Sequence, residues 1–179
     1  MAGVAVSRLT LDSNVLLDYW NDRPRKAVVE ELLRLSQDGK VDLIITRVIR
    51  DDIPREPWAS YIAQLPALGV RETGTVARWG ISTWDGGDMW GSDGSSALDA
   101  AFPGLVELAK HRITAKMRAK PPSWEDLNHL LGHQVQGRDY FLTWDRGILL
   151  IADELKGKHG ISVMAPDEYV AIHGDDLRS

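Results

Sequence analysis

The feature that most restricts the fold is a repeated switch between short β-rich runs and longer segments with helical apolar spacing. Residues 8–11 form a β-rich run that stops at Asp12, and residues 13–20 carry apolar side chains at helical intervals. Residues 25–37 repeat the helical pattern, and residues 41–46 form a second β-rich run. Because parallel strands are joined by crossovers that helices usually supply, this alternation predicts βαβ units and a mostly parallel sheet.

The last third of the chain continues the alternation. We expect a helix from Ser123 to about Gln136, a strand over residues 139–144 and a helix over residues 146–156. A last strand at residues 161–164 and a short helix starting at Pro166 follow. The predicted fold class is therefore α/β, and a chain of 179 residues is expected to form a single domain.

The middle of the chain gives a weaker signal. Residues 68–72 are compatible with one short strand, and residues 97–117 look helical with a kink at Pro103. Residues 74–96 are rich in tryptophan and glycine without a period, and we interpret them as a long ordered loop or lid. We treat residues from about 57 to 96 as a Trp/Gly-rich insertion into the domain.

Composition excludes several function classes. The chain has no cysteine, which excludes disulfides, thiolate nucleophiles and cysteine-ligated metal sites. A net charge of -5 argues against a surface that binds nucleic acid through counterion release alone, so such a contact would have to be local. The sequence carries neither a basic leader ahead of an apolar run nor 18 consecutive apolar residues, and we expect a cytoplasmic protein without membrane contact.

Acidic residues follow the predicted strands. Asp12 follows the first strand, Asp51 and Asp52 come shortly after the second, and Asp145 follows the fourth, while Asp126 lies early in the helix that precedes that strand. The carboxyl ends of parallel strands meet at one edge of a sheet, so we expect these side chains to converge. Clustered carboxylates repel one another and favour a hard cation, Mg²⁺ or Mn²⁺. Such a cation can activate water and bind phosphodiester oxygens.

Each acid also has a structural interpretation. Asp12 and Asp126 are compatible with helix caps, Asp145 with a turn residue, and Asp51 and Asp52 with solvated charges. Their joint placement at one sheet edge favours the functional interpretation, because helix caps have no reason to share one edge.

Other motifs give weaker signals. His129 and His133 have the spacing of paired zinc ligands but lack the intervening glutamate of a metalloprotease helix, and we interpret them as packing or helix-face residues. The run from Asp12 to Asn14 is similar to the start of phospho-aspartyl phosphatases, although asparagine stands where their second aspartate is needed.

Three segments together resemble the PIN-domain nucleases, a family that includes toxin-type ribonucleases of toxin–antitoxin systems. These are residues 11–18, residues 126–146 with the ending Thr143-Trp144-Asp145, and residues 163–169. The resemblance implies a three-layer α/β/α sandwich. It implies metal-binding roles for Asp12, Asp126 and Asp145, and a phosphate or metal-water contact for Thr143.

The family's remaining acid falls on Asp52, where this chain has the shorter aspartate in place of the usual glutamate, and the neighbouring Asp51 is the alternative. The implied catalytic residues are therefore Asp12, Asp52, Asp126 and Asp145, with Mg²⁺ or Mn²⁺ as cofactor. We expect Asn14, Thr143 and Arg146 to bind substrate. Arg47 and Arg50 are close enough in sequence to the acids to offset phosphate charge, although they can equally be surface residues.

The implied function is a metal-dependent endoribonuclease that hydrolyses RNA phosphodiester bonds and acts as the toxin of a toxin–antitoxin pair. Its expected partners are RNA, an antitoxin protein and a second copy of the chain. Single-stranded RNA is favoured because its bases can stack on exposed tryptophans. The alternative is a catalytically inactive PIN-like binding module that acts through protein or RNA contacts.

Overall fold

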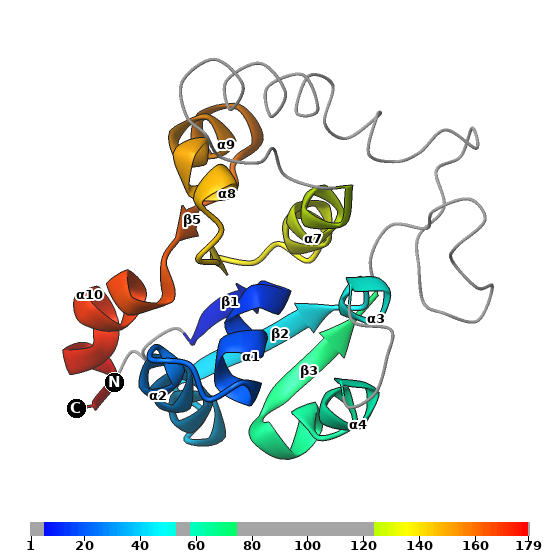
Figure 1. Cartoon of the computed structure of the whole chain (residues 1–179). Coiled ribbons are helices and arrows are strands. Elements are labelled where there is room, and N and C mark those ends of the chain that lie inside the picture. Colours follow the sequence, from blue (N-terminus) through cyan, green and yellow to red (C-terminus); the bar gives the residue numbers. More distant parts are fainter. Residues whose placement is uncertain (1–5, 53–57, 75–123, 179) are drawn as a thin grey trace.

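The structure, a computed structural model, describes residues 6–52, 58–74 and 124–178 (Figure 1). Its centre is a five-stranded sheet in the order β3-β2-β1-β4-β5, in which every neighbouring pair is parallel. The strands are β1 (Ser7–Leu11), β2 (Val41–Thr46), β3 (Val70–Thr73), β4 (Tyr140–Leu142) and β5 (Val163–Met164). The predicted α/β class with a parallel central sheet is confirmed.

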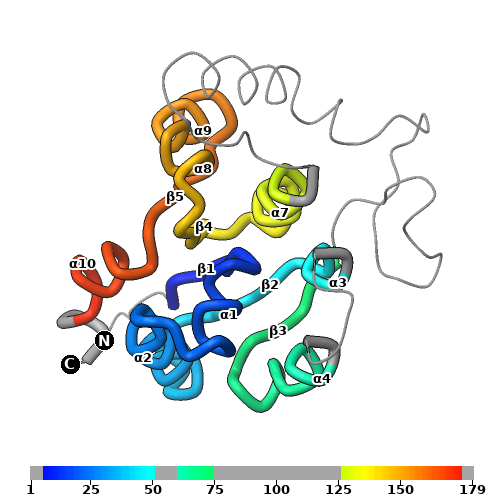
Figure 2. The backbone as a smooth tube through the Cα atoms, viewed as in Figure 1, coloured from blue at the N-terminus to red at the C-terminus, as the bar shows by residue number. Residues whose placement is uncertain are grey.

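Helices connect these strands and cover both faces of the sheet, as Figure 2 traces along the backbone. Between β1 and β3 in the sequence, the helices are α1 (Ser13–Trp20), α2 (Lys26–Gln37), α3 (Ile49–Asp52), α4 (Trp58–Ile62) and the 3-10 helix η1 (Leu65–Leu68). After β3 in the sequence, the described helices are α7 (Trp124–Val135), α8 (Arg146–Leu150), α9 (Ala152–His159) and α10 (Pro166–Arg178). This arrangement is a three-layer α/β/α sandwich.

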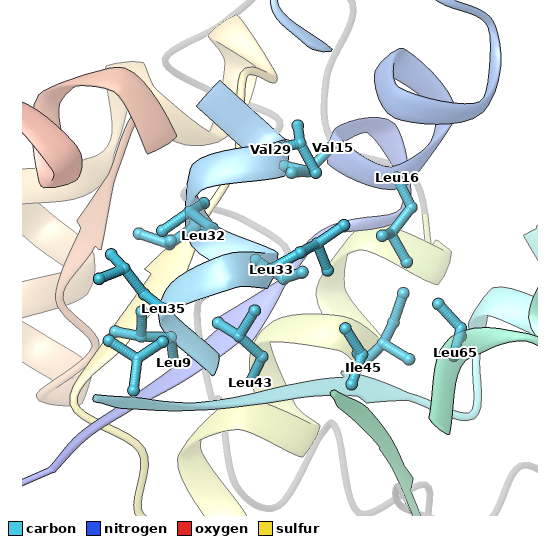
Figure 3. Close-up of a cluster of buried hydrophobic side chains, with 14 of the residues drawn as sticks. Leu9, Val15, Leu16, Val29, Leu32, Leu33, Leu35, Leu43, Ile45 and Leu65 are labelled. Atoms are coloured by element: carbon cyan, nitrogen blue, oxygen red, sulfur yellow. The ribbon is translucent and has the colours of Figure 1, made fainter. Parts of the chain in front are cut away.

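One face of the sheet packs against α1 and α2. Leu9 and Leu11 of β1 point to this face, since side chains alternate along a strand, and both are completely buried. Figure 3 shows apolar side chains of α1 and α2 lying over those of β1 and β2. Burying each such leucine or valine contributes about 1.5–3 kcal/mol, so this cluster holds the first three strands together.

The opposite face packs against α7, α8 and α9. Phe141 of β4 points to this side and joins a second buried cluster. The other members are Leu127, Leu130, Leu131, Ile148, Ile151, Leu155 and Ile161. The sheet separates the two clusters, and in β4 the neighbouring residues Phe141 and Leu142 belong to opposite ones.

Several elements differ from the sequence-based expectation, and the last two strands are shorter than expected, with β4 at Tyr140–Leu142 and β5 at Val163–Met164. The helix predicted over residues 146–156 is interrupted at Ile151, whose amide bonds to the Ile148 carbonyl three residues back, and this tighter turn separates α8 from α9. Ile151 is buried in the second cluster, so its side chain packs against the sheet at the point where the helix is interrupted.

The first part of the expected insertion belongs to the sandwich. Residues 58–73 form α4, η1 and β3, and β3 is an edge strand paired with β2. The remainder of the insertion and the helix expected at residues 97–117 lie outside the described residues. In the ranges that the structure describes, no helix is both long and apolar enough to cross a membrane.

Candidate functional site

The sheet has a switch point between β1 and β4. From β1 the chain goes to β2 on one side, while β4 joins the other side much later in the sequence. In parallel sheets of this kind, ligands bind in the crevice outside the carboxyl ends of the strands at such a point. Asp12 follows β1 here, and its backbone amide donates to the carbonyl of Leu142 at the end of β4.

Asp12 is nearly buried, with 2% exposure, and its carboxylate accepts hydrogen bonds from the neutral side chains of Thr143, Asn14 and Ser13. The Thr143 hydroxyl donates to Oδ2 at 2.5 Å and the Asn14 amide donates to the same oxygen at 2.7 Å. The Ser13 hydroxyl donates to Oδ1 over 3.4 Å. Asp12 occupies the N-cap position of α1, but its side chain makes no capping hydrogen bond to that helix.

Thr143 and Asn14 connect the ends of the two strands. The Thr143 hydroxyl accepts from the Asn14 amide at 3.0 Å and from the backbone amide of Asp145 at 2.8 Å. Asn14 Oδ1 in turn accepts from the amide of Trp144 at 3.3 Å. A hydroxyl has one donor and two acceptor positions, and all three are used in the completely buried Thr143. Thr143 therefore holds the Asp12 carboxylate and the backbone of Asp145 in place.

A second branch of the same network runs to α7 and β2. His129 is completely buried, with Nε2 3.3 Å from the Ser13 hydroxyl and Nδ1 2.5 Å from the Thr46 hydroxyl at the end of β2. With Thr46 donating to Nδ1 and Nε2–H donating to Ser13, the Ser13 proton is directed at Asp12. We call Asp12, Ser13, Asn14, Thr46, His129 and Thr143 the Asp12 network.

The other predicted acids lie at the start of α8, on α7 and on α3. Asp145 is the N-cap of α8, where its Oδ1 accepts from the Ile148 amide at 3.0 Å, so it is a helix cap rather than the turn residue of the structural interpretation. Asp126 is in the first turn of α7, three residues before His129 and hence on the same helix face. Asp51 and Asp52 end α3, and their side chains lie outside the described part of the structure.

The described side chains do not form a closed metal cage. Within the described ranges, no three histidine, aspartate or glutamate side chains gather closely enough to hold one ion. Mg²⁺ does not require such a cage, because proteins usually bind it through one or two carboxylates together with waters and substrate phosphates. The hard oxygen donors of Asp12 and Asp145 fit this mode of binding.

A pocket of about 650 Å³ opens beside the network, between the start of α1, the α1–α2 connection and the turn from β4 into α8. It is lined by Asn14, Asp18, Arg23, Pro24, Arg25, Trp144, Asp145, Arg146 and Gly147, and we call it the arginine pocket. Three guanidinium groups face two carboxylates here, which favours an anionic ligand. Asn14 belongs to both the pocket and the Asp12 network.

The residues expected to bind substrate lie in different places relative to the arginine pocket. Asn14 and Arg146 line the arginine pocket, whereas Thr143 does not. Arg50 forms a two-pronged ion pair with Glu72 at 2.7 and 2.6 Å, which uses its guanidinium for structure.

Sequence reasoning missed Asp18, Arg23, Arg25 and the pocket role of Trp144. The Arg23-Pro24-Arg25 run directly after the first helix could have indicated the pocket, because two arginines there lie in the connection near the carboxyl edge of the sheet.

The histidines expected to be packing or helix-face residues are both buried. His129 belongs to the Asp12 network, and His133 of α7 packs against the sheet with Nδ1 3.0 Å from the Thr10 hydroxyl.

Comparison of the chain with protein-family models, with curated proteins and with solved structures gave no match.

Proposed function

We propose that the protein is a Mg²⁺- or Mn²⁺-dependent ribonuclease, with Asp12, Asp126 and Asp145 as metal-binding carboxylates and Asp52 as a fourth acid. The observation that carries the proposal is the position of the Asp12 network beside the arginine pocket at the switch point of the sheet. Metal-dependent cleavage of a phosphodiester needs carboxylate oxygens for the cation and positive charge for the phosphate, and both are supplied at this edge.

The acids beside the central strands have different kinds of partner at the two edges of the sheet, and this difference supports the assignment of Asp12. At the amino edge, Arg8 bonds to Asp139 at 2.9 Å and holds the pKa of that carboxyl below its usual value. Burial raises the pKa of Asp42, but hydrogen bonds from Arg138 and Arg71 outweigh it and lower the pKa. At the carboxyl edge, Asp12 accepts hydrogen bonds from the hydroxyls of Thr143 and Ser13 and from the Asn14 amide.

Each part of the site has a defined task in this proposal. A bound Mg²⁺ or Mn²⁺ would lower the pKa of a coordinated water and offset charge on the phosphate. Asn14 and Thr143 hold the Asp12 carboxylate in place, and the cap on α8 fixes the direction of Asp145. The pocket arginines bind phosphate oxygens of the substrate.

The test is cleavage of single-stranded RNA by the wild type and by Asp12→Asn, in Mn²⁺ and in EDTA. The wild type should cleave only with the metal, and the variant should not cleave. Asparagine keeps an oxygen for Thr143 and Asn14, and its amide can donate to Ser13, so the variant should fold. Because the hydrogen bonds lose their charge assistance, we expect it to be about 1–3 kcal/mol less stable.

Asp153→Asn is the matched control, since Asp153 is an exposed carboxylate on α9. It should cleave at the wild-type rate. Equal cleavage by Asp12→Asn and Asp153→Asn would reject the nuclease proposal.

A second candidate is a binding module that holds RNA or a protein without cleaving it. The observation in its favour is that three donors already satisfy the Asp12 carboxylate. A wild-type protein that binds single-stranded RNA but leaves it intact in both Mg²⁺ and Mn²⁺ would establish this function instead.

The toxin role is tested in cells. Expression of the wild type in a bacterial host should arrest growth, whereas Asp12→Asn at the same protein level should not. A small companion protein encoded in the adjacent reading frame should then restore growth, which would identify the antitoxin.

A further inference from the structure

The arginine pocket has more binding capacity than the cleavage chemistry requires. Its volume of about 650 Å³ is in the range of sites that hold a small organic ligand, and a single phosphate group would leave most of it empty. Asp145 lies in its wall, so a ligand in the pocket touches the residue that the proposed reaction uses.

The positive charge in the pocket is only partly neutralised. Arg23 pairs with Asp18 at 2.8 Å through one nitrogen, Nη1, which leaves its other donors for a ligand. Arg25 and Arg146 have no carboxylate partner within 4.0 Å among the residues that the structure describes, and both are exposed. The pocket therefore offers guanidinium donors whose natural counterpart is a phosphate.

The pocket also offers a flat stacking surface. The guanidinium of Arg25 lies 4.9 Å from the centre of the Trp144 ring. The Trp144 indole nitrogen donates to Asp167 at 2.7 Å, and the Trp144 amide donates to Asn14, so the ring is held from two sides. Nucleobases stack on aromatic rings and on guanidinium planes, and a fixed ring loses little entropy when a base joins it.

We propose that the arginine pocket binds one nucleotide of single-stranded RNA next to the scissile phosphate, with its phosphate on Arg23 and Arg146 and its base against the Arg25–Trp144 pair. This inference rests on the proposed ribonuclease function and names the residues that hold the substrate. Duplex RNA does not fit it, because a paired base is already stacked and cannot enter the pocket.

The experiment measures binding of a fluorescein-labelled single-stranded RNA of about 10 nucleotides by fluorescence anisotropy, in EDTA so that no cleavage occurs. The variants are Arg25→Gln and Arg146→Gln. The matched control is Arg34→Gln, which removes the same charge from the exposed face of α2, where Arg34 pairs with Glu31 and Asp38.

Arg25→Gln should weaken binding roughly 10-fold through loss of the stacked cation. Arg146→Gln should lower the slope of log affinity against log salt by about 0.7, the value for one phosphate contact on a single strand. Arg34→Gln should bind like the wild type, and the duplex of the same sequence should bind more weakly than the single strand.

The outcomes separate this inference from the proposed function. If both pocket variants bind and cleave like Arg34→Gln while the wild type is an active nuclease, the pocket inference is overturned and the function stands. If the pocket variants lose binding but the wild type cleaves no RNA, the function fails and the pocket remains an RNA-binding site. Displacement of the RNA by inorganic phosphate as effectively as by unlabelled RNA would show a phosphate-only site and overturn the inference.

Discussion

His133 is a buried residue whose protonation affects the stability of the fold. Its ring lies edge-on to Phe141 at 5.7 Å, and one nitrogen bonds to the Thr10 hydroxyl. Burial, with a smaller contribution from the positive charge of Arg138, lowers its pKa to about 4. The neutral ring is therefore the form that the folded protein accommodates.

This pKa predicts an acid-sensitive stability. In the unfolded chain His133 binds a proton below pH of about 6.5, whereas the folded protein does so only near pH 4, so stability falls as pH decreases between these values. The loss due to this residue should approach roughly 3 kcal/mol at the acid end. Urea unfolding across this pH window should show a shallower decline for His133→Gln than for the wild type. Parallel curves for the two proteins would contradict the shifted pKa.

At the scale of elements, α7 is attached to the sheet by polar as well as apolar contacts. His129 reaches the ends of β1 and β2, and His133 reaches the middle of β1, while the leucines of α7 enter the second cluster. The helix that carries Asp126 is thus positioned relative to Asp12 by hydrogen bonds with fixed directions. This makes the histidines positioning residues of the candidate site.

A second element contact predicts a measurable difference between two glycines. Gly69, between η1 and β3, has φ of +78°, and a Cβ there would lie 3.2 Å from the Ser36 hydroxyl at the end of α2. That hydroxyl already donates to the Gly69 carbonyl at 2.7 Å, so it cannot easily move away. Gly69→Ala should therefore lose more than the backbone cost of about 1–2 kcal/mol.

Gly39→Ala is the control for this contact. Gly39 has φ of +70° but nothing within 4 Å of the added Cβ, so the alanine variant should lose the backbone cost alone. Urea midpoints of the two variants give the comparison. Equal losses would mean that the contact with α2 contributes nothing.

The elements that were predictable are those with a clear local pattern. The bounds of α1 and β2 agree with the expectation because apolar periodicity and the following polar turn define them. α4 and η1 were not predicted, since short helices at the sheet edge depend on packing rather than on a local period. β3 was only a weak expectation because four residues carry little alternation.

The candidate site was predictable to a similar extent. The positions of Asp12 and Asp145 at strand ends follow from the alternation of elements. The partners of Asp12 do not, because Thr143 and His129 reach it from distant parts of the chain and only the folded sheet brings them together. Arg25 was missed for the same reason, since its contact with Trp144 crosses the switch point.

For the whole molecule, a bound cation should be visible as stabilisation. A ligand that binds only the folded state at 100 times its dissociation constant adds about 2.7 kcal/mol. For a domain of this size that corresponds to roughly 5–10 °C in melting temperature. Thermal melts in Mn²⁺ and in EDTA should differ by this amount for the wild type and Asp153→Asn, and should coincide for Asp12→Asn. Coincident melts for the wild type would argue against a metal at Asp12.

The strand order has a consequence for the growing chain. β1 can pair with β2 only after Thr46 has left the ribosome, and its other edge has no partner until β4, which ends at Leu142, has left it too. At synthesis rates of about 5–20 residues per second, the central strand spends roughly 5–20 s with one edge unpaired. An open apolar edge is where strands of other chains attach. We therefore expect the nascent chain to be prone to aggregation, and the yield of folded protein should depend on translation speed and chaperone supply.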